Sequence, residues 1–212
     1  SFGTLSHLHE EQTVKLLRDI AAHGAPGSVL LGDWLGRWSG EWQDLWDLDT
    51  TREQWMDYRI SYIYSPQERA RRHIDSFKLR LVSPDEVNRM AANAAHADRT
   101  LSLERLDDRS VFIGRHIDTG EYNGNPQPVR ESVNTLFEPT MQTPLDRLHW
   151  KYFPREGFTE QNAELARMSG EWNLIVEHAR ACIDAHEKGR GACPPVPAEA
   201  SDDVRTLIET LS

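Results

Sequence analysis

The amino-acid sequence predicts a mainly α-helical protein that forms a single domain, residues 1–212, with a small β-hairpin and a long ordered loop. Two observations support this prediction. Capping boxes, which mark helix starts, occur at Thr50 with Glu53, at Ser65 with Glu68 and at Ser83 with Glu86. Several segments also carry apolar residues at the three-to-four-residue spacing that is typical of a helix packed on a core. An α+β fold is the alternative.

The stretch from Gly32 to Trp46 carries a tryptophan at every fourth position. On a helix with about 100° per residue, these tryptophans and the leucines around them fall in an arc of about 120°, and Arg37 falls outside it. Each interior glycine destabilises a helix by about 1 kcal/mol, but burial of each large apolar side chain stabilises the fold by about 1.5–3 kcal/mol. We therefore expect a helix whose indoles face inward.

Four further helices are expected in the first half of the chain. Residues 7–22 have mostly helical spacing and end at Gly24. Residues 50–64 alternate as in a strand but also share a helical face, and we favour the helix. The segments 65–82 and 83–97 each begin with Ser-Pro, with proline at the first helical position. In the first of them, the sequence FKLRLV also allows a strand.

The second half of the chain has a different pattern. Residues 100–117 contain two alternating runs around a polar turn and predict a β-hairpin. Residues 118–158 show no period, contain five of the eleven prolines and are rich in aromatic residues, so we expect a long ordered loop. The longest helix is expected from Thr159 to Gly189. Residues 189–201 form a linker to a short C-terminal helix.

Composition limits the classes of function. The formal net charge of −10 repels phosphate backbones, so nucleic acid is not an expected partner, whereas a basic protein is. No apolar run reaches the roughly 18 residues of a membrane span. Only Cys182 and Cys193 are present, which favours a reducing, cytoplasmic setting and makes Cys182 a small core residue. The chain starts at Ser1, which leaves room for a removed N-terminal segment such as a signal peptide.

No phosphate-binding loop, zinc-protease or nucleophile-elbow motif occurs in the sequence. His116 and Asp118 form a His-x-Asp pair where the expected hairpin runs into the loop. With His149 or His178 they would give the 2-His-1-carboxylate ligand set of a mononuclear iron site. The same spacing occurs at two other histidines, so a surface or helix-capping role is the alternative.

Asp146 and His149 lie three residues apart, and a carboxylate at this spacing can orient a histidine as a general base. Aromatic residues spread over the chain could line a pocket between helices: Trp38, Trp42, Tyr62, Tyr122 and Trp150. An ordinary core role for the tryptophans is the simpler interpretation. In the pocket interpretation the loop acts as a lid, with His149 and Trp150 facing a cavity near His116.

Three hypotheses for function follow. The first is a helical domain with an aromatic-lined pocket for a small, largely apolar molecule, which includes an enzyme acting on it through His116, Asp118 and His149. The second is a non-haem iron oxygenase, hence an oxidoreductase, that uses the same three residues as ligands. The third is an acidic interaction or inhibitor protein that binds a basic partner. The sequence does not specify a substrate, cofactor or metal.

Overall fold

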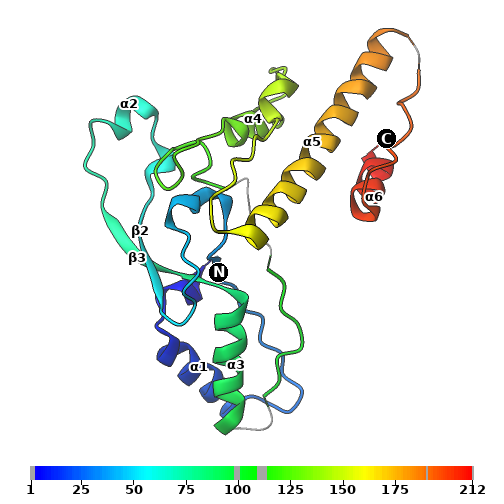
Figure 1. Cartoon of the computed structure of the whole chain (residues 1–212). Coiled ribbons are helices and arrows are strands. Elements are labelled where there is room, and N and C mark those ends of the chain that lie inside the picture. Colours follow the sequence, from blue (N-terminus) through cyan, green and yellow to red (C-terminus); the bar gives the residue numbers. More distant parts are fainter. Residues whose placement is uncertain (1–2, 98–100, 109–113, 190, 212) are drawn as a thin grey trace. The chain divides into compact units, whose positions relative to one another are not determined.

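The computed structural model describes residues 3–97, 101–108, 114–189 and 191–211 (Figure 1). The chain divides into two compact units, residues 1–111 and 112–212, and each is described by itself. Helices make up 47% of the described residues and strands 8%, and the strands form one three-stranded sheet. The prediction of a mainly α fold is therefore wrong, and the structure corresponds to the α+β alternative.

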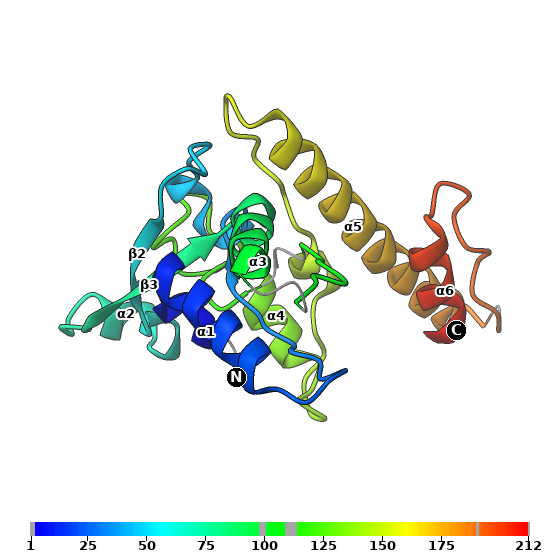
Figure 2. The same cartoon turned by 90° about the horizontal axis from the view of Figure 1, so that it is seen from below.

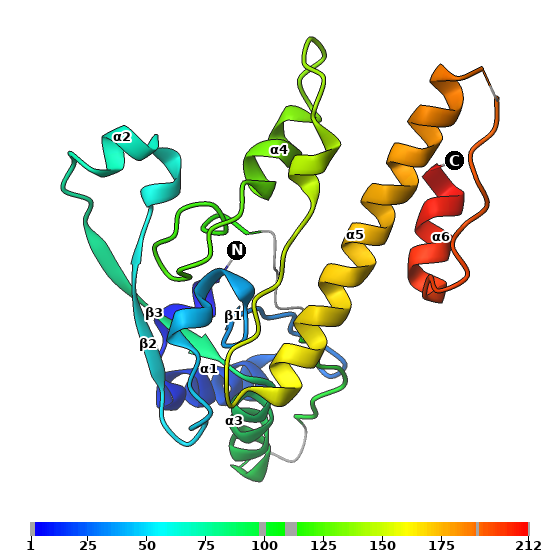
Figure 3. The same ribbon diagram turned by 45° about the horizontal axis from the view of Figure 1, so that its top comes forward.

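The sheet lies in the first unit and is built around β3 (Ser76–Val82). On one side β3 pairs in parallel with the two-residue strand β1 (Leu35–Gly36), with Leu35 opposite Leu81. On the other side it pairs antiparallel with β2 (Gln54–Arg59), from Arg59 opposite Ser76 to Gln54 opposite Leu81. All three strands are visible in Figure 3. The last four residues of β3 are buried, so this strand is the centre of the unit.

The tryptophan-rich stretch is not a helix. It consists of β1 followed by the 3₁₀ helix η2 (Gly40–Leu45), inside which Trp42 has non-helical backbone angles. The indole nitrogen of Trp42 donates to the Gly36 carbonyl at 2.9 Å, and that of Trp46 donates to the Ser39 carbonyl at 3.0 Å. These bonds fold the segment back on itself, so the indoles are buried within a compact loop rather than along one face of a helix.

Two further helix predictions are wrong. Residues 50–64 form β2 and the 3₁₀ helix η3 (Ser61–Ile63), because cross-strand pairing with β3 satisfies the alternating pattern. The capping box at Ser65 does begin a helix, α2, but it ends after four residues (Pro66–Arg69). The FKLRLV sequence then belongs to β3. In both places tertiary pairing overrides the local helical signal.

Two longer helices cover the first unit's core and confirm the sequence prediction. The 3₁₀ helix η1 (Thr4–His7) leads into α1 (Glu10–His23), and the capping box at Ser83 begins α3 (Pro84–Ala97). Figure 2 shows α1 and α3 side by side. They enclose a cluster of buried apolar side chains: Val14, Val82, Val87, Met90 and Ala94.

In the second unit, α5 (Thr159–Glu187) is the longest helix and confirms the predicted one. The expected loop is ordered but contains the helix α4 (Val129–Thr135) and the 3₁₀ helix η4 (Leu145–Leu148). The expected hairpin is not seen in the described part of 100–117, since 101–108 contain no strand and 114–117 lie in a turn. Residues 109–113 of that prediction lie outside the described residues.

The chain after η4 is held against α5 by side-chain bonds. Trp172 donates its indole N–H to the Leu148 carbonyl at 2.6 Å. Asn173 accepts from the Trp150 backbone N–H and donates to the Trp150 carbonyl, both at 2.9 Å. One helical side chain thus satisfies both backbone groups of Trp150, which is the role that a neighbouring strand would play in a sheet.

After α5, Gly189 and Gly191 adopt positive φ angles and turn the chain towards α6 (Asp202–Leu211), the predicted C-terminal helix. α6 lies beside α5, as Figures 1 and 3 show. The contact is a small apolar cluster in which Ala200, Val204 and Ile208 pack against Leu174 and Ile175 of α5 and against Val196 of the linker. A disulfide joins Cys182 to Cys193 across 11 residues, so Cys182 is bonded to the linker and is not the separate small core residue that the sequence favoured.

Candidate functional site

A buried charge cluster lies at the centre of the first unit. The carboxylate of Glu86 contacts Arg37 at 2.8 Å and Arg80 at 3.0 Å, and all three side chains are 0% exposed. The same carboxylate accepts the backbone N–H of Ser83 at 2.9 Å. Because isolated buried charges cost several kcal/mol, these three groups depend on one another.

Arg37 is held by the loop that follows the tryptophan-rich stretch. Its Nη1 donates to the carbonyls of Asp49 at 2.9 Å and Asp47 at 3.3 Å, and its Nη2 donates to that of Arg52 at 2.9 Å. A planar guanidinium can serve several acceptors and a carboxylate at the same time. Arg37 therefore links the chain at residues 47–52 to α3 through Glu86.

A second branch of the cluster reaches the surface through Glu10 at the start of α1. Arg89 binds both Glu10 carboxylate oxygens, with distances of 3.1 and 2.9 Å, and Arg80 approaches at 3.3 Å. The hydrogen bond from Arg89 is the main cause that holds the pKa of Glu10 below its ordinary value of 4.5, and the charge of Arg80 adds to it. Arg89 also donates to the Thr50 carbonyl at 3.0 Å.

Glu53 joins β2 to the start of α1. Its carboxylate accepts the backbone N–H of Glu10 at 2.5 Å and the Trp55 indole N–H at 3.0 Å, and it contacts His9 Nδ1 at 2.7 Å. Burial raises the pKa of Glu53, but these hydrogen bonds and the charge of Arg80 outweigh it, so the pKa lies below its ordinary value. The carboxylate fixes the His9 ring, whose side chain is 61% exposed and lies 4.7 Å from the Trp55 ring.

A groove of about 360 Å³ opens between α1 and α3. It is lined by Glu10, Glu11, Val14, Arg18 and Asn93. Arg18 donates to the Asn93 carbonyl at 2.8 Å, which places its guanidinium at the α3 side of the groove. His9 does not line it, so the Glu53–His9 pair serves mainly to tie the start of α1 to β2.

Two of the predicted site residues, His116 and Asp118, lie in the second unit and contact neighbouring side chains. His116 is buried, with Nδ1 3.3 Å from Thr119 Oγ1 and its ring 4.9 Å from that of Tyr122. The Asp118 carboxylate accepts three hydrogen bonds of 3.0–3.2 Å from the guanidinium of Arg130. Arg130 therefore occupies both carboxylate oxygens that the iron hypothesis would use as ligands.

His149 lies beside a different carboxylate from the one expected. Its Nε2 lies 2.5 Å from Glu177 Oε1 on α5, whereas Asp146 forms an ion pair with Arg180. Trp150 is buried against α5 by the Asn173 bonds. These contacts join the loop to α5 and do not place His149 beside His116. Within the part of the chain that the structure describes, no group of three His, Cys, Asp or Glu side chains is arranged to hold a metal ion.

The aromatic residues predicted to line one pocket are divided between the two units. Trp38, Trp42 and Tyr62 belong to the first unit, and Tyr122 and Trp150 to the second. Trp42 is buried, and the Trp38 ring packs edge-on against Trp46 at 6.2 Å. None of the five lines the groove between α1 and α3.

The sequence analysis missed the charged residues that organise the first unit. The sequence analysis placed Arg37 outside the buried arc of the expected tryptophan helix, where charged residues usually lie, and gave no role to Arg80. Two features of the sequence could have indicated the cluster. They are Glu86, three positions after Ser83 in the capping box, and the strand alternative for FKLRLV. A strand there turns Arg80 and Leu81 to opposite faces, so one face carries a charge that needs a partner.

Comparisons with protein-family models, with curated proteins and with solved structures found no match to the chain. None of the described helices is both long enough and apolar enough to cross a membrane. The class of protein is therefore set by the fold and the site alone. It is an α+β protein with a buried arginine–glutamate cluster beside an open, charged groove.

Proposed function

We propose that the protein binds a small zwitterionic molecule in the groove between α1 and α3. The observation that supports this most directly is the lining of the groove, which carries an acidic and a basic side chain on α1 with a valine between them. A ligand with an ammonium group, a short apolar chain and a carboxylate matches that order. Ligand sites usually combine apolar walls with a few placed polar groups.

The spacing of these residues defines the ligand further. Glu11, Val14 and Arg18 follow each other at intervals of three and four, so they share one face of α1. Seven residues of helix separate Glu11 from Arg18 by roughly 10 Å along the axis. Glu11 supplies the anionic end and Arg18 the cationic end. Glu10 also lines the groove, but its carboxylate is already bound by Arg89.

The charge cluster supports the proposal because it fixes the two helices that form the groove. Glu10 on α1 is bound by Arg89 on α3, and Arg80 connects both helices to β3 through Glu10 and Glu86. A groove between helices held in this way is preorganised, so the ligand need not order it on binding.

The test uses linear ω-amino acids of increasing chain length, measured by isothermal titration calorimetry. An intermediate length should bind best, and alkylamines or alkanoates of the same length should bind more weakly. Glu11→Gln and Arg18→Gln should each weaken the best ligand by about tenfold, since each removes a charge-assisted hydrogen bond. Lys15→Gln, an exposed change on α1 at a residue that does not line the groove, is the matched control. Equal binding by all variants would refute the proposal.

A second candidate is an interaction protein, as the sequence hypothesis of an acidic protein with a basic partner proposes. The observation that favours it is the segment after α1, where Val29 and Leu31 are 91% and 94% exposed. Leu30 between them is 45% exposed, and contiguous exposed apolar side chains are typical of contact sites. A photo-cross-linker at position 29 should capture a basic protein in a salt-sensitive complex, and Leu31→Ser should weaken that complex.

The other sequence hypotheses remain proposals with their own tests. An aromatic-lined pocket, with or without catalysis by His116, Asp118 and His149, predicts that His149→Ala abolishes binding of an apolar ligand at unchanged melting temperature. The iron hypothesis predicts stoichiometric iron in the purified protein. A cytoplasmic location predicts that the two cysteines are largely reduced when thiols are trapped by alkylation in intact cells, because cytosolic thiols are kept reduced.

A further inference from the structure

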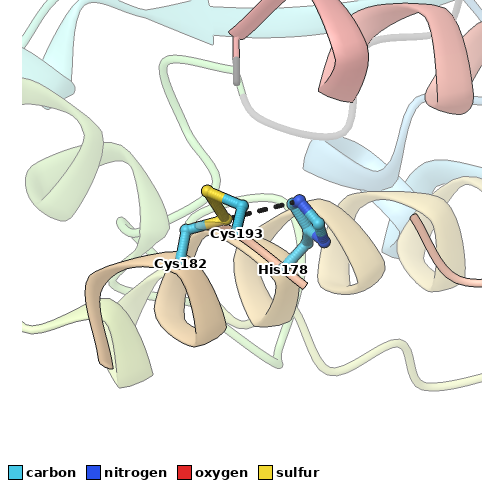
Figure 4. Close-up of a disulfide and its surroundings, with 3 residues drawn as sticks. All are labelled: His178, Cys182 and Cys193. Carbon is cyan, nitrogen blue, oxygen red and sulfur yellow. Dashed lines mark hydrogen bonds between the residues drawn. A yellow bond between two sulfur atoms is a disulfide. The ribbon is translucent and has the colours of Figure 1, made fainter. Parts of the chain in front are cut away.

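The disulfide between Cys182 and Cys193 has an imidazole beside one of its two sulfur atoms. His178 lies one turn before Cys182 on α5, and its Nε2 is 3.4 Å from the Cys182 sulfur (Figure 4). His178 is buried and Cys182 is half-buried, whereas Cys193 lies exposed in the linker. The two cysteines therefore differ both in the exposure of the residue and in the contact with His178.

We propose that this group is a thiol–disulfide exchange site for low-molecular-weight thiols and dithiols. The external thiolate attacks the exposed sulfur of Cys193 and forms a new S–S bond to it. The bond between Cys193 and Cys182 breaks, and its electron pair leaves on the sulfur of Cys182. His178 donates its Nε2–H to that departing thiolate and transfers to it the proton that the attacking thiol released.

A second thiol completes the reaction. It attacks the external sulfur of the mixed disulfide, and Cys193 leaves as a thiolate that takes a proton from water. In total, two thiols become one disulfide, and the protein disulfide becomes two thiols. The protein is reduced by two electrons and the thiol reagent is oxidised by the same number.

The position of Cys182 on the helix explains why His178 matters. Cys182 lies five residues before the end of α5, where the last carbonyl groups of the helix carry partial negative charge. This field disfavours a thiolate, so a neighbouring hydrogen-bond donor is needed to stabilise it. His178 lies four residues towards the N-terminus of the helix, on the same face.

The first experiment measures the second-order rate constant for reduction of the full-length protein by dithiothreitol, with alkylation and mass spectrometry as the readout. His178→Gln should lower the rate constant by about fivefold, since a less stabilised thiolate leaves more slowly. His73→Gln, an exposed change in the first unit, is the matched control and should leave the rate unchanged. An equal rate for His178→Gln and the wild type would overturn the proposal.

A second experiment on the wild-type protein does not depend on the folding of a variant. Reaction with limiting reduced glutathione, quenched by acid, should place the glutathione adduct on Cys193 and leave the free thiol on Cys182. Peptide mapping identifies the two positions. An adduct mainly on Cys182, or an even division between the cysteines, would overturn the proposed direction of attack.

Discussion

The two units of the chain hold their helices in place by different kinds of interaction. In the first unit, charged side chains connect the helices to a sheet, and Glu86 with its two arginines lies fully buried between them. In the second unit, irregular chain is bound to one long helix by the polar side chains of Trp172 and Asn173 and by a disulfide. The first unit thus depends on a few mutually dependent charges, and the second on separate local bonds.

This difference has a consequence for how each unit responds to mutation. Removing one member of a buried charge cluster leaves the other charges buried without a counter-ion. The loss in the free energy of unfolding is then larger than the contribution of a single contact. Removing a separate hydrogen bond costs only that bond and the desolvation of its partner. Five of the seven tryptophans lie in residues 1–111, so tryptophan fluorescence reports mainly on the first unit and helical circular dichroism reports on both.

The largest effect is expected from Glu86→Gln. The substitution keeps the shape of the side chain but leaves Arg37 and Arg80 buried without an anion. We expect a loss of about 3–5 kcal/mol in the free energy of unfolding of the first unit, measured by urea titration with tryptophan fluorescence. Asp85→Asn, an exposed change at the neighbouring residue, is the control and should change stability by less than about 0.5 kcal/mol. An equal loss of stability in Glu86→Gln and Asp85→Asn would show that the charges of the cluster do not depend on one another.

The next largest loss of stability is expected in the second unit, on removal of the disulfide. Replacing Cys182 and Cys193 by serine should lower stability by about 3 kcal/mol in the chain-entropy description of a loop of this size. The loss should appear first as faster hydrogen exchange in α6, because its apolar contact with α5 is small. Unchanged exchange in α6 would show that the apolar contact alone holds the helix.

The helices of the fold could be predicted wherever a capping signal and an apolar stripe agree over several turns. Residues in α1, α3 and α5 meet this condition, and α6 was predicted from its apolar spacing alone. The stretch from Gly32 to Trp46 shows why the pattern alone is insufficient. A four-residue spacing suits a helix, but the indole N–H groups of Trp42 and Trp46 bond backbone carbonyls within the stretch and stabilise a compact loop. Periodicity does not reveal such bonds.

Most of the candidate site could not be predicted from the sequence, because its residues are defined by contacts between distant segments. A buried arginine resembles a surface arginine until its partner is known, and the partners of Arg37 come from distant segments. The groove residues Glu11 and Arg18 belong to an ordinary amphipathic helix, and only the packing of α3 beside them creates a cavity. For His149 the sequence indicated a carboxylate partner, but the structure supplies it from α5 through Glu177.

A smaller effect is expected from Asn173→Ala in the second unit. The change removes both bonds to the backbone of the buried residue Trp150, and it should lower stability by about 2 kcal/mol. Thermal unfolding monitored by circular dichroism provides the measurement. Asn134→Ala on the exposed surface of α4 is the matched control and should shift the melting temperature little. A cost near zero would mean that water replaces the Asn173 bonds.

The stability of the first unit should fall on acidification because two of its carboxyl groups have lowered pKa values. The pKa values of Glu10 and Glu53 lie below 4.5 in the folded state, so their stabilising contribution is complete above about pH 4.5. It is lost as the pH falls through the folded-state values, since protonation then removes the bound anion. Arg89→Met should flatten this acid dependence because it removes the main cause of the lowered Glu10 pKa. An unchanged acid profile in Arg89→Met would contradict this assignment.

The smallest effect is expected from Glu164→Gln on α5. The pKa of Glu164 is also lowered, chiefly by its hydrogen bond to Arg167, so its contribution likewise disappears on acidification below about pH 4.5. Both side chains are 54% exposed, however, and water and salt screen the pair. We expect a loss of at most about 0.5 kcal/mol in low salt that vanishes in 1 M salt, measured by urea titration with circular dichroism. A cost approaching that of Glu86→Gln would mean that burial does not separate the two kinds of ion pair in this chain.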